Sequence, residues 1–188
     1  MTRPQRWRDR VLPLVGALVL VAALTATAPD LTSPPRQWVP LTVGETGTLR
    51  DFSIGVTRVE QAASVEVRGE PLTTTGVFVV VDVEADVLTA PTTFSRVQLE
   101  TRSGDRYDPR SEWVAAEPPL TQPGFTVRGS WVFEVPAGLG AGAALLVENE
   151  PREFDGYDRG LRIELGLETT APVGGTVRLT DASTGLTR

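Results

Sequence analysis

The stretch Gly76–Val87 alternates in polarity with a period of two. Its odd positions are valine or alanine throughout, whereas its even positions turn from apolar, at Phe78 and Val80, to acidic. Because successive side chains of a strand point to opposite faces, the odd positions predict an unbroken buried face. Branched valine favours strands over helices, so we expect a core strand of an antiparallel β protein.

Shorter alternating patterns predict further strands. The strongest is Phe125–Val135, which places Trp131 on an apolar face with Phe125 and Phe133 and is ended by Pro136. We therefore expect Trp131 to lie in the core. The other expected strands are bounded by Gly- and Pro-rich turns and cover residues 42–49, 52–56, 94–100, 143–147 and 161–167.

A break in phase predicts a β-bulge in the segment that begins at Phe52. Apolar residues stand at Ile54 and Val56 and then at Val59, which is one residue too late for strict alternation. With about seven to nine short strands and no long amphipathic helix after residue 28, the expected fold is all-β. Specifically, we expect an immunoglobulin-like antiparallel β-sandwich preceded by one N-terminal transmembrane helix.

The N-terminal segment has the composition of a membrane-targeting signal. Residues 1–10 contain four arginines, and residues 11–28 contain no charged side chain. As a helix, residues 11–28 would be about 27 Å long, close to the hydrocarbon thickness of a bilayer. The arginines then predict a single-pass protein with its N-terminus in the cytoplasm and its C-terminal domain outside the membrane.

Two alternatives remain open for this segment: an uncleaved signal anchor or a signal peptide cleaved after Ala28. The sequence Ala26-Thr27-Ala28 has the small residues that signal peptidase requires, but Pro29 would follow the cut and is expected to block it. Trp7 and Trp38 flank the run as interfacial aromatic residues do. We therefore favour the signal anchor.

Composition divides the rest of the chain into three parts. Residues 29–40 are rich in proline and are expected to form an extended stalk, serving either as a spacer or as an unstructured leader. Residues 41–168 are expected to form the sandwich. Residues 169–188 are rich in Gly, Thr and Ser; Thr176–Thr180 is a candidate edge strand, and the last residues are expected to fray.

Several residue types are missing, and their absence excludes common chemistries. The chain has no Cys and no His, and all of its 18 basic residues are Arg. Without these groups there is no thiolate, no His-based triad and no Schiff-base lysine, so we expect no enzyme activity, no cofactor and no metal site. The net charge of −6, with four of the arginines confined to residues 1–10, also argues against a nucleic-acid partner.

Three places in the sequence are candidate interaction sites. Asp82, Glu84 and Asp86 share one strand face and could face a cation, arginines of a neighbouring strand, or simply solvent. Trp113 lies in a loop, where it is expected either to contact a partner or carbohydrate or to cover an edge of the core. Residues 148–158 are rich in acids, but their spacing does not match a calcium loop, so calcium binding remains open.

Five segments taken together resemble a known family. These are Val43-Gly44-Glu45, Gly76–Val83, Gly104-Asp105-Arg106-Tyr107, Pro123–Gly129 and Val132–Pro136. Their order and spacing are similar to those of the telokin-like immunoprotective extracellular domains of actinobacteria and of related membrane-anchored bacterial domains of unknown function. The resemblance implies an immunoglobulin-like sandwich outside the membrane and assigns no catalytic residue. Such domains often have Asn where this chain has Asp86-Val87, which puts the local turn in question.

The predicted function follows from these elements. We expect a non-enzymatic binding or interaction module of the cell envelope, attached to the membrane by its N-terminal helix and facing an unknown envelope protein or ligand. Two alternatives are an accessory subunit of a membrane or envelope complex, and a secreted protein released by signal-peptide cleavage. The sequence specifies neither the ligand nor the oligomeric state.

Overall fold

The computed structural model describes residues 37–67, 69–110, 119–149, 159–168, 175–179 and 181–187, all within one compact unit. The segment 11–28, the loop residue Trp113 and residues 150–158 lie outside the described residues. Among the residues described, no helix is both long and apolar enough to span a bilayer. The described strands are β1 (Gln37–Thr42), β2 (Thr46–Thr48), β3 (Phe52–Val67), β4 (Glu70–Val87), β5 (Val97–Glu100), β6 (Arg106–Tyr107), β7 (Phe125–Val135), β8 (Ala144–Glu148), β9 (Arg159–Glu164), β10 (Thr176–Arg178) and β11 (Ser183–Leu186).

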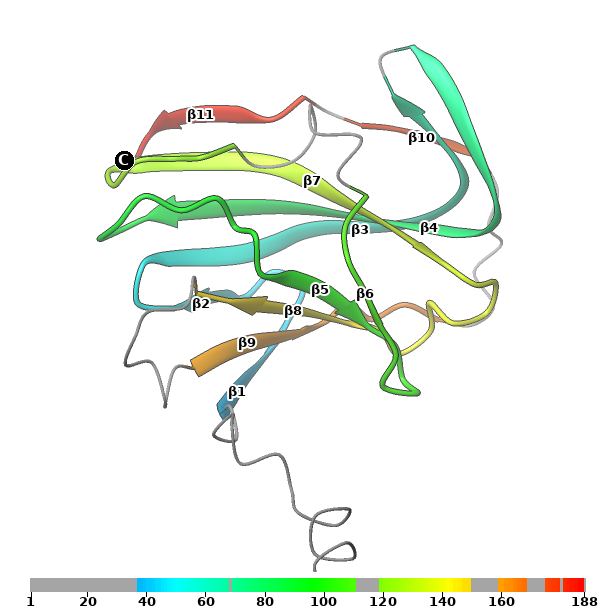
Figure 1. Cartoon of the computed structure of the whole chain (residues 1–188), viewed down its shortest axis with the longest axis horizontal. Coiled ribbons are helices and arrows are strands. Elements are labelled where there is room, and N and C mark those ends of the chain that lie inside the picture. The colour runs from blue at the N-terminus through cyan, green and yellow to red at the C-terminus, as the bar shows by residue number, and fades with distance from the viewer. Residues whose placement is uncertain are drawn as a thin grey trace, which may run out of the picture. The chain divides into compact units, whose positions relative to one another are not determined.

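These strands form two sheets that face each other as a β-sandwich (Figure 1). One sheet has the order β1-β9-β8-β5-β6, and the other has the order β10-β3-β4-β7-β11, with β2 paired to β3. The pairs β1–β9 and β10–β3 are parallel, and the other recorded pairs are antiparallel. The predicted all-β sandwich is confirmed.

The predicted apolar face of the central strand is buried between the sheets. All odd positions from Val77 to Val87 on β4 belong to the main core cluster, and none is more than 3% exposed. Trp131 on β7 is 2% exposed and pairs with Val81, as its predicted place in the core requires. Leu145 and Ile163 pack against this face from the five-stranded sheet.

The predicted bulge is present in β3. The register of β3 against β4 shifts between Val56 and Arg58, so that Thr57 is the additional residue. The shift returns Val59 to the inner face opposite Val81 and places Arg58 opposite Asp82 on the outer face. The bulge therefore restores the alternation and supplies the acidic positions of β4 with a cation.

A second, smaller apolar cluster lies on the outer face of the six-stranded sheet. Its buried members are Val65, Phe78, Val80 and Val132. Val177 and Leu179, from the C-terminal segment, pack against this cluster. In Figure 1, β10 lies beside the bent distal part of the β3–β4 hairpin and is followed by β11 alongside β7. The C-terminal segment thus extends both edges of this sheet instead of fraying.

Several strands begin at places other than those expected; β4, for example, begins at Glu70 rather than at Gly76. β1 starts at Gln37, four residues before the expected sandwich boundary, because Trp38 packs against Gly160 and Val39 packs against the core. β5 starts at Val97 rather than at Phe94, which has a left-handed backbone with φ 52°. Phe94 instead inserts its ring beside Phe52, with a centroid distance of 4.9 Å. A left-handed backbone is unfavourable for a residue with a side chain, and burial of the Phe94 ring offsets this cost.

Candidate functional site

The acidic positions of β4 lie on the outer face of the six-stranded sheet and are already paired. Asp82 accepts hydrogen bonds from Arg58 Nε and from Ser130 Oγ, both at 2.6 Å. Arg58 comes from β3 and Ser130 from β7, directly opposite Asp82 in each register. Both oxygens of the Asp82 carboxylate are therefore held by neighbouring strands.

The other two members of this acidic row also bond to β7. Arg128 Nε donates to Glu84 at 2.7 Å, and Thr126 Oγ1 donates to Asp86 at 2.5 Å. Of the alternatives weighed from the sequence, the structure therefore places arginines and hydroxyls of neighbouring strands beside the row. Within the described part of the chain, no group of three or more His, Cys, Asp or Glu side chains is arranged to hold a metal ion.

The ion pairs keep the arginines of this face charged. The hydrogen bond to Asp82 and the charge of that carboxylate raise the pKa of Arg58 above its ordinary value. The hydrogen bond to Glu84 raises the pKa of Arg128 in the same direction. Neither arginine can therefore act as a proton donor or acceptor near neutral pH, and the row presents fixed charges.

Two shallow hollows flank the acidic row and share Thr57 and Glu84. The hollow towards the C-terminal segment has a volume of about 340 Å³ and is bordered there by Asp181 and Ser183. The hollow towards β2 has a volume of about 370 Å³ and includes Asp86. Among the described lining residues of the two hollows, Asp82, Glu84, Asp86 and Asp181 outnumber the cation Arg128, and Arg58 is the second arginine bonded to the row.

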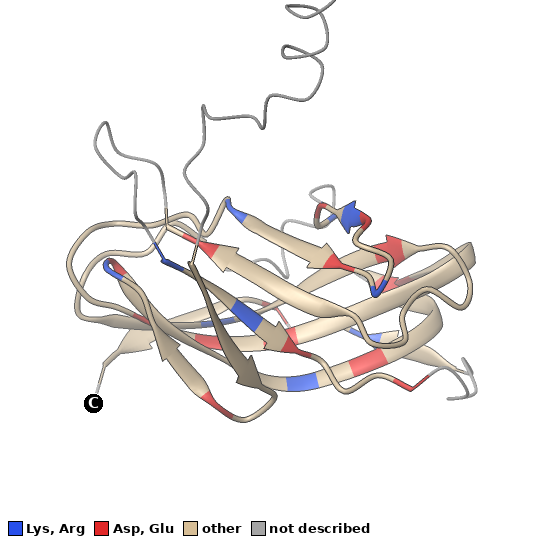
Figure 2. Cartoon of the chain, turned by 90° about the horizontal axis from the view of Figure 1, so that it is seen from below, with Lys and Arg blue, Asp and Glu red and all other residues tan. Residues whose placement is uncertain are grey.

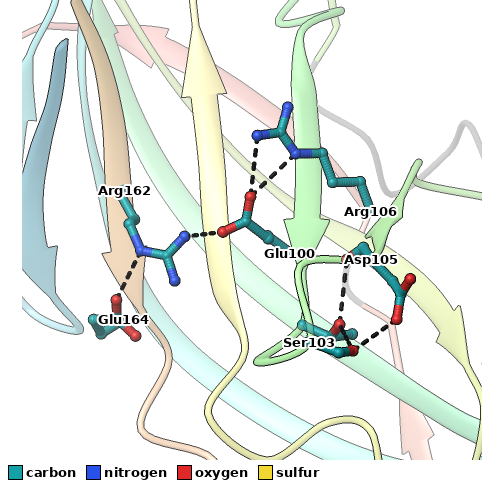
Figure 3. Close-up of polar contacts among 7 residues, drawn as sticks. Glu100, Ser103, Asp105, Arg106, Arg162 and Glu164 are labelled. Atoms are coloured by element: carbon teal, nitrogen blue, oxygen red, sulfur yellow. Dashed lines mark hydrogen bonds and ion pairs between the residues drawn. The ribbon is translucent and has the colours of Figure 1, made fainter. Parts of the chain in front are cut away.

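The outer face of the five-stranded sheet carries a second polar network, shown in Figure 3. Glu100 on β5 is bonded by Arg106 on β6 and by Arg162 on β9, and Arg162 Nε also donates to Glu164 at 3.0 Å. Arg162 must reach across β8 to contact Glu100. The residue between Glu164 and Glu100 in register is Ala144, whose small side chain leaves room for the guanidinium.

This network fixes the position and the charge of its arginines. Burial alone would lower the pKa of Arg162, but its hydrogen bonds to Glu100 and Glu164 and their charges raise it above the ordinary value. At the β5–β6 turn, Ser103 Oγ donates to Asp105 at 2.6 Å, and Gly104 has a φ of 91°. The turn thus holds Arg106 next to Glu100.

Beside this network lies a hollow of about 310 Å³ that sequence reasoning did not identify. Its lining residues are Ser95, Arg96, Gln98, Arg106, Asp108, Leu146 and Glu148. Arg96 pairs with Glu148 at 3.2 Å, and Gln98 Nε2 donates to Asp108 at 2.9 Å. The residues come from β5, β6, β8 and adjoining segments, so only the strand order brings them together. The sequence predicted a strand over 94–100 but gave no sign of the partners of Gln98.

A tryptophan lies near this hollow on the same sheet. Trp38 of β1 covers Gly160 of β9, where any Cβ would collide with the indole ring. Gly160 is in turn the register partner of Glu148, a lining residue of the hollow. Trp38 was expected to be an interfacial membrane aromatic; its indole instead packs on the sheet, as aromatic rings do over strand glycines.

Most of the remaining sequence candidates lie outside the described residues, namely Trp113 and residues 150–158 of the acidic loop. The two described residues of that loop have partners: Glu148 pairs with Arg96, and Asn149 Oδ1 accepts a hydrogen bond from the backbone N–H of Asp51 at 3.4 Å. Figure 2 shows both acidic and basic residues on the described strands.

Fold and surface together define an all-β, two-sheet sandwich whose outer faces carry paired charges. The yjhA protein of Bacillus subtilis matches this fold with a TM-score of 0.51 at 14% identity, over 66% of this chain and 99% of that chain. The secreted protein MPT63 of Mycobacterium tuberculosis gives a TM-score of 0.49 at 17% identity, over 69% and 99% of the respective chains. No family model and no curated protein sequence matches the chain. At these identities the likeness to the yjhA protein establishes the sandwich fold and nothing further.

Proposed function

We propose that this protein is a non-enzymatic, extracytoplasmic binding module that stays attached to the cell membrane through an uncleaved N-terminal helix. One observation carries the proposal: an arginine-rich segment and the uncharged run 11–28 directly precede the sandwich, whose first strand begins at Gln37. This order places a hydrophobic signal in front of a domain that has no membrane-spanning helix among its described residues.

The tether is short. Only residues 29–36 separate the hydrophobic run from β1, and they can span at most about 26–29 Å when fully extended. The prolines in this segment favour such an extended form. The sandwich would therefore meet its ligand or partner close to the membrane surface, within reach of envelope components and neighbouring membrane proteins.

The chemistry of the outer faces supports binding rather than catalysis. Asp82 and Glu84 are each bonded to an arginine of a neighbouring strand, so this face presents fixed pairs of opposite charge. Rigid arrays of fixed donors and acceptors are suited to recognition. We retain the acidic row of Asp82, Glu84 and Asp86, together with Trp113, as candidate interaction residues.

We further propose that the sandwich is immunoglobulin-like and related to the telokin-like immunoprotective extracellular domains. Two of the supporting motifs have clear structural roles. Gly104, in the β5–β6 turn, and Gly124, before β7, both have left-handed φ angles, of 91° and 86°. These positions favour glycine, which explains why such motifs accompany the fold.

Cell fractionation tests the anchor. The full-length chain should be found in membranes, and residues after Pro40 should be cleaved by protease added from outside. Pro29→Ala is a matched variant, because it removes the residue expected to block cleavage after Ala28 and should release more of the domain. Recovery of the unaltered chain mainly from the medium, with an N-terminus near Pro29, would instead establish the secreted alternative.

An accessory subunit of a membrane complex is the second candidate function. The run 11–28 includes Gly16 and Ala17, small residues that permit close helix packing. Replacing the run by an unrelated membrane helix distinguishes the two functions. A subunit that binds through its helix should lose its partners in mild detergent, whereas a module that binds through the sandwich should keep them.

A further inference from the structure

The hollow on the five-stranded sheet has the chemistry of a site for a neutral ligand. Among its described lining residues, the cations Arg96 and Arg106 balance the anions Asp108 and Glu148. We propose that this hollow binds a neutral, hydroxyl-rich ligand, namely a sugar unit of an envelope glycan. This rests on the proposed role as a binding module but not on the membrane anchor.

The described lining of the hollow offers both hydrogen-bond donors and acceptors. Arg96 uses Nη1 for its pair with Glu148, and Arg106 uses Nε and Nη2 for its pair with Glu100. An arginine has five N–H donors, so each retains further donors directed by a fixed ion pair. The Gln98 side chain adds an acceptor oxygen, because its bond to Asp108 uses Nε2. A sugar hydroxyl both donates and accepts, and this mixed lining suits it better than a ligand of one charge.

One apolar side chain lies among the polar lining residues of the hollow. Leu146 points to the outer face of β8 and is only 2% exposed, yet it lines the hollow. Its register partners are Gln98 and Arg162, whose long side chains flank it. Trp38 packs on Gly160 of the same sheet, one register position from Glu148, outside the described lining of the hollow. Sugar rings present hydroxyls as well as C–H faces, and a mainly polar lining with one apolar contact suits both.

The acidic row offers the contrasting surface. Its neighbouring hollow is lined by Asp82, Glu84 and Asp181 with Arg128 as the sole cation among its described lining residues. That surface would favour a cationic ligand, and salt would weaken the interaction. The charge of the ligand and the salt dependence of its affinity therefore distinguish binding at the hollow on the five-stranded sheet from binding at the acidic row.

Calorimetric titration of the full chain, in a detergent without a sugar headgroup, tests the assignment. The neutral probes are chitohexaose and cellohexaose, and the charged probe is the deacetylated, cationic hexamer of chitohexaose. At least one neutral hexamer should bind at millimolar concentration, with an affinity that is insensitive to salt. Arg106→Gln and Gln98→Leu should each weaken that binding about tenfold, because each removes directed hydrogen bonds.

Arg178→Gln provides the matched control, because Arg178 is an exposed arginine of β10 that lies on the other sheet. It should leave the affinity unchanged, and thermal melts should show that all three variants remain folded. The proposal is overturned if neither neutral hexamer binds. It is equally overturned if only the cationic hexamer binds and Glu84→Gln abolishes that binding. These titrations do not depend on where the domain resides, so failure of the anchor in fractionation is a separate result.

Discussion

The two apolar clusters of this sandwich differ in what covers them. The main cluster lies between two sheets and draws buried residues from β3, β4, β5, β7, β8 and β9. The outer cluster has four buried members and is covered by Val67, Val177 and Leu179. β10 itself is only three residues long. The main cluster is therefore enclosed by a second sheet. The outer cluster packs against the segment of a short strand at the edge of its own sheet.

The even positions of β4 show the consequence within a single strand. Phe78 and Val80 belong to the outer cluster, against which Val177 and Leu179 of the C-terminal segment pack, and both are buried. Asp82 and Glu84, further along the same face, lie outside that cluster and are bonded to arginines. The change from apolar to acidic residues thus follows the limit of the cluster.

The largest effect is expected between the sheets. Phe133→Ala and Trp131→Ala should each reduce the free energy of unfolding by about 3–5 kcal/mol, because the facing sheet cannot collapse into the cavity. Both side chains are at most 2% exposed. Urea denaturation measures the loss. A loss below about 1 kcal/mol for Trp131→Ala would mean that β7 faces the other way in solution.

Phe78→Ala is the matched change in the outer cluster. Phe78 is 1% exposed and therefore as buried as Phe133. We nevertheless expect a smaller loss, about 2–3 kcal/mol, because the C-terminal segment can move into the space that the ring leaves. The same urea titration compares the two variants. Equal losses for Phe78 and Phe133 would show that the outer cluster is as rigid as the core.

Sequence alone predicted the main cluster because its signal is local. The alternation on β4 and β7 follows from side-chain geometry, and the bulge near Val59 follows from a break in that alternation. The outer cluster required the position of β10, which lies more than a hundred residues after the β3 strand that it pairs with. The pattern showed that Phe78 and Val80 leave the alternation but could not show what covers them.

The candidate sites also include features that are encoded within one strand and features that depend on neighbouring strands. The shared face of Asp82, Glu84 and Asp86 was readable from spacing within one strand. Their partners Arg58 and Arg128 depend on the register of two other strands. The hollow around Gln98 and Leu146 depends on the strand order β8-β5-β6, which alternation does not encode.

Leu179→Ala tests whether the cover opens independently of the core. Leu179 is partly buried against the outer cluster, and all four residues of β11 are exposed. We expect the variant to lower hydrogen-exchange protection of the β11 amides while reducing global stability by about 1 kcal/mol or less. Protection of the β4 amides near Val81 should be unchanged. A parallel loss of protection in β4 would show that cover and core open as one unit.

The smallest effect is expected at Ser64, whose neighbour Val65 belongs to the outer cluster. Ser64 lies opposite both Thr73 and Thr176 in register, at the second register shift of β3. Among the described residues, its hydroxyl is the buried side-chain polar group without a hydrogen-bond partner. Ser64→Ala should therefore raise the free energy of unfolding by about 0.5–1 kcal/mol, since it removes a desolvated hydroxyl and loses no bond.

Ser130→Ala is the matched control for this last prediction. Ser130 is also buried, at 2% exposed against 9% for Ser64, but its hydroxyl donates to Asp82 at 2.6 Å, so the same substitution should cost about 1–2 kcal/mol. Chemical denaturation of the two variants should thus give opposite signs. If Ser64→Ala instead destabilises the protein by about 1 kcal/mol or more, the hydroxyl bonds to a buried water. Such a water would be buried at the second register shift of β3, next to the outer cluster.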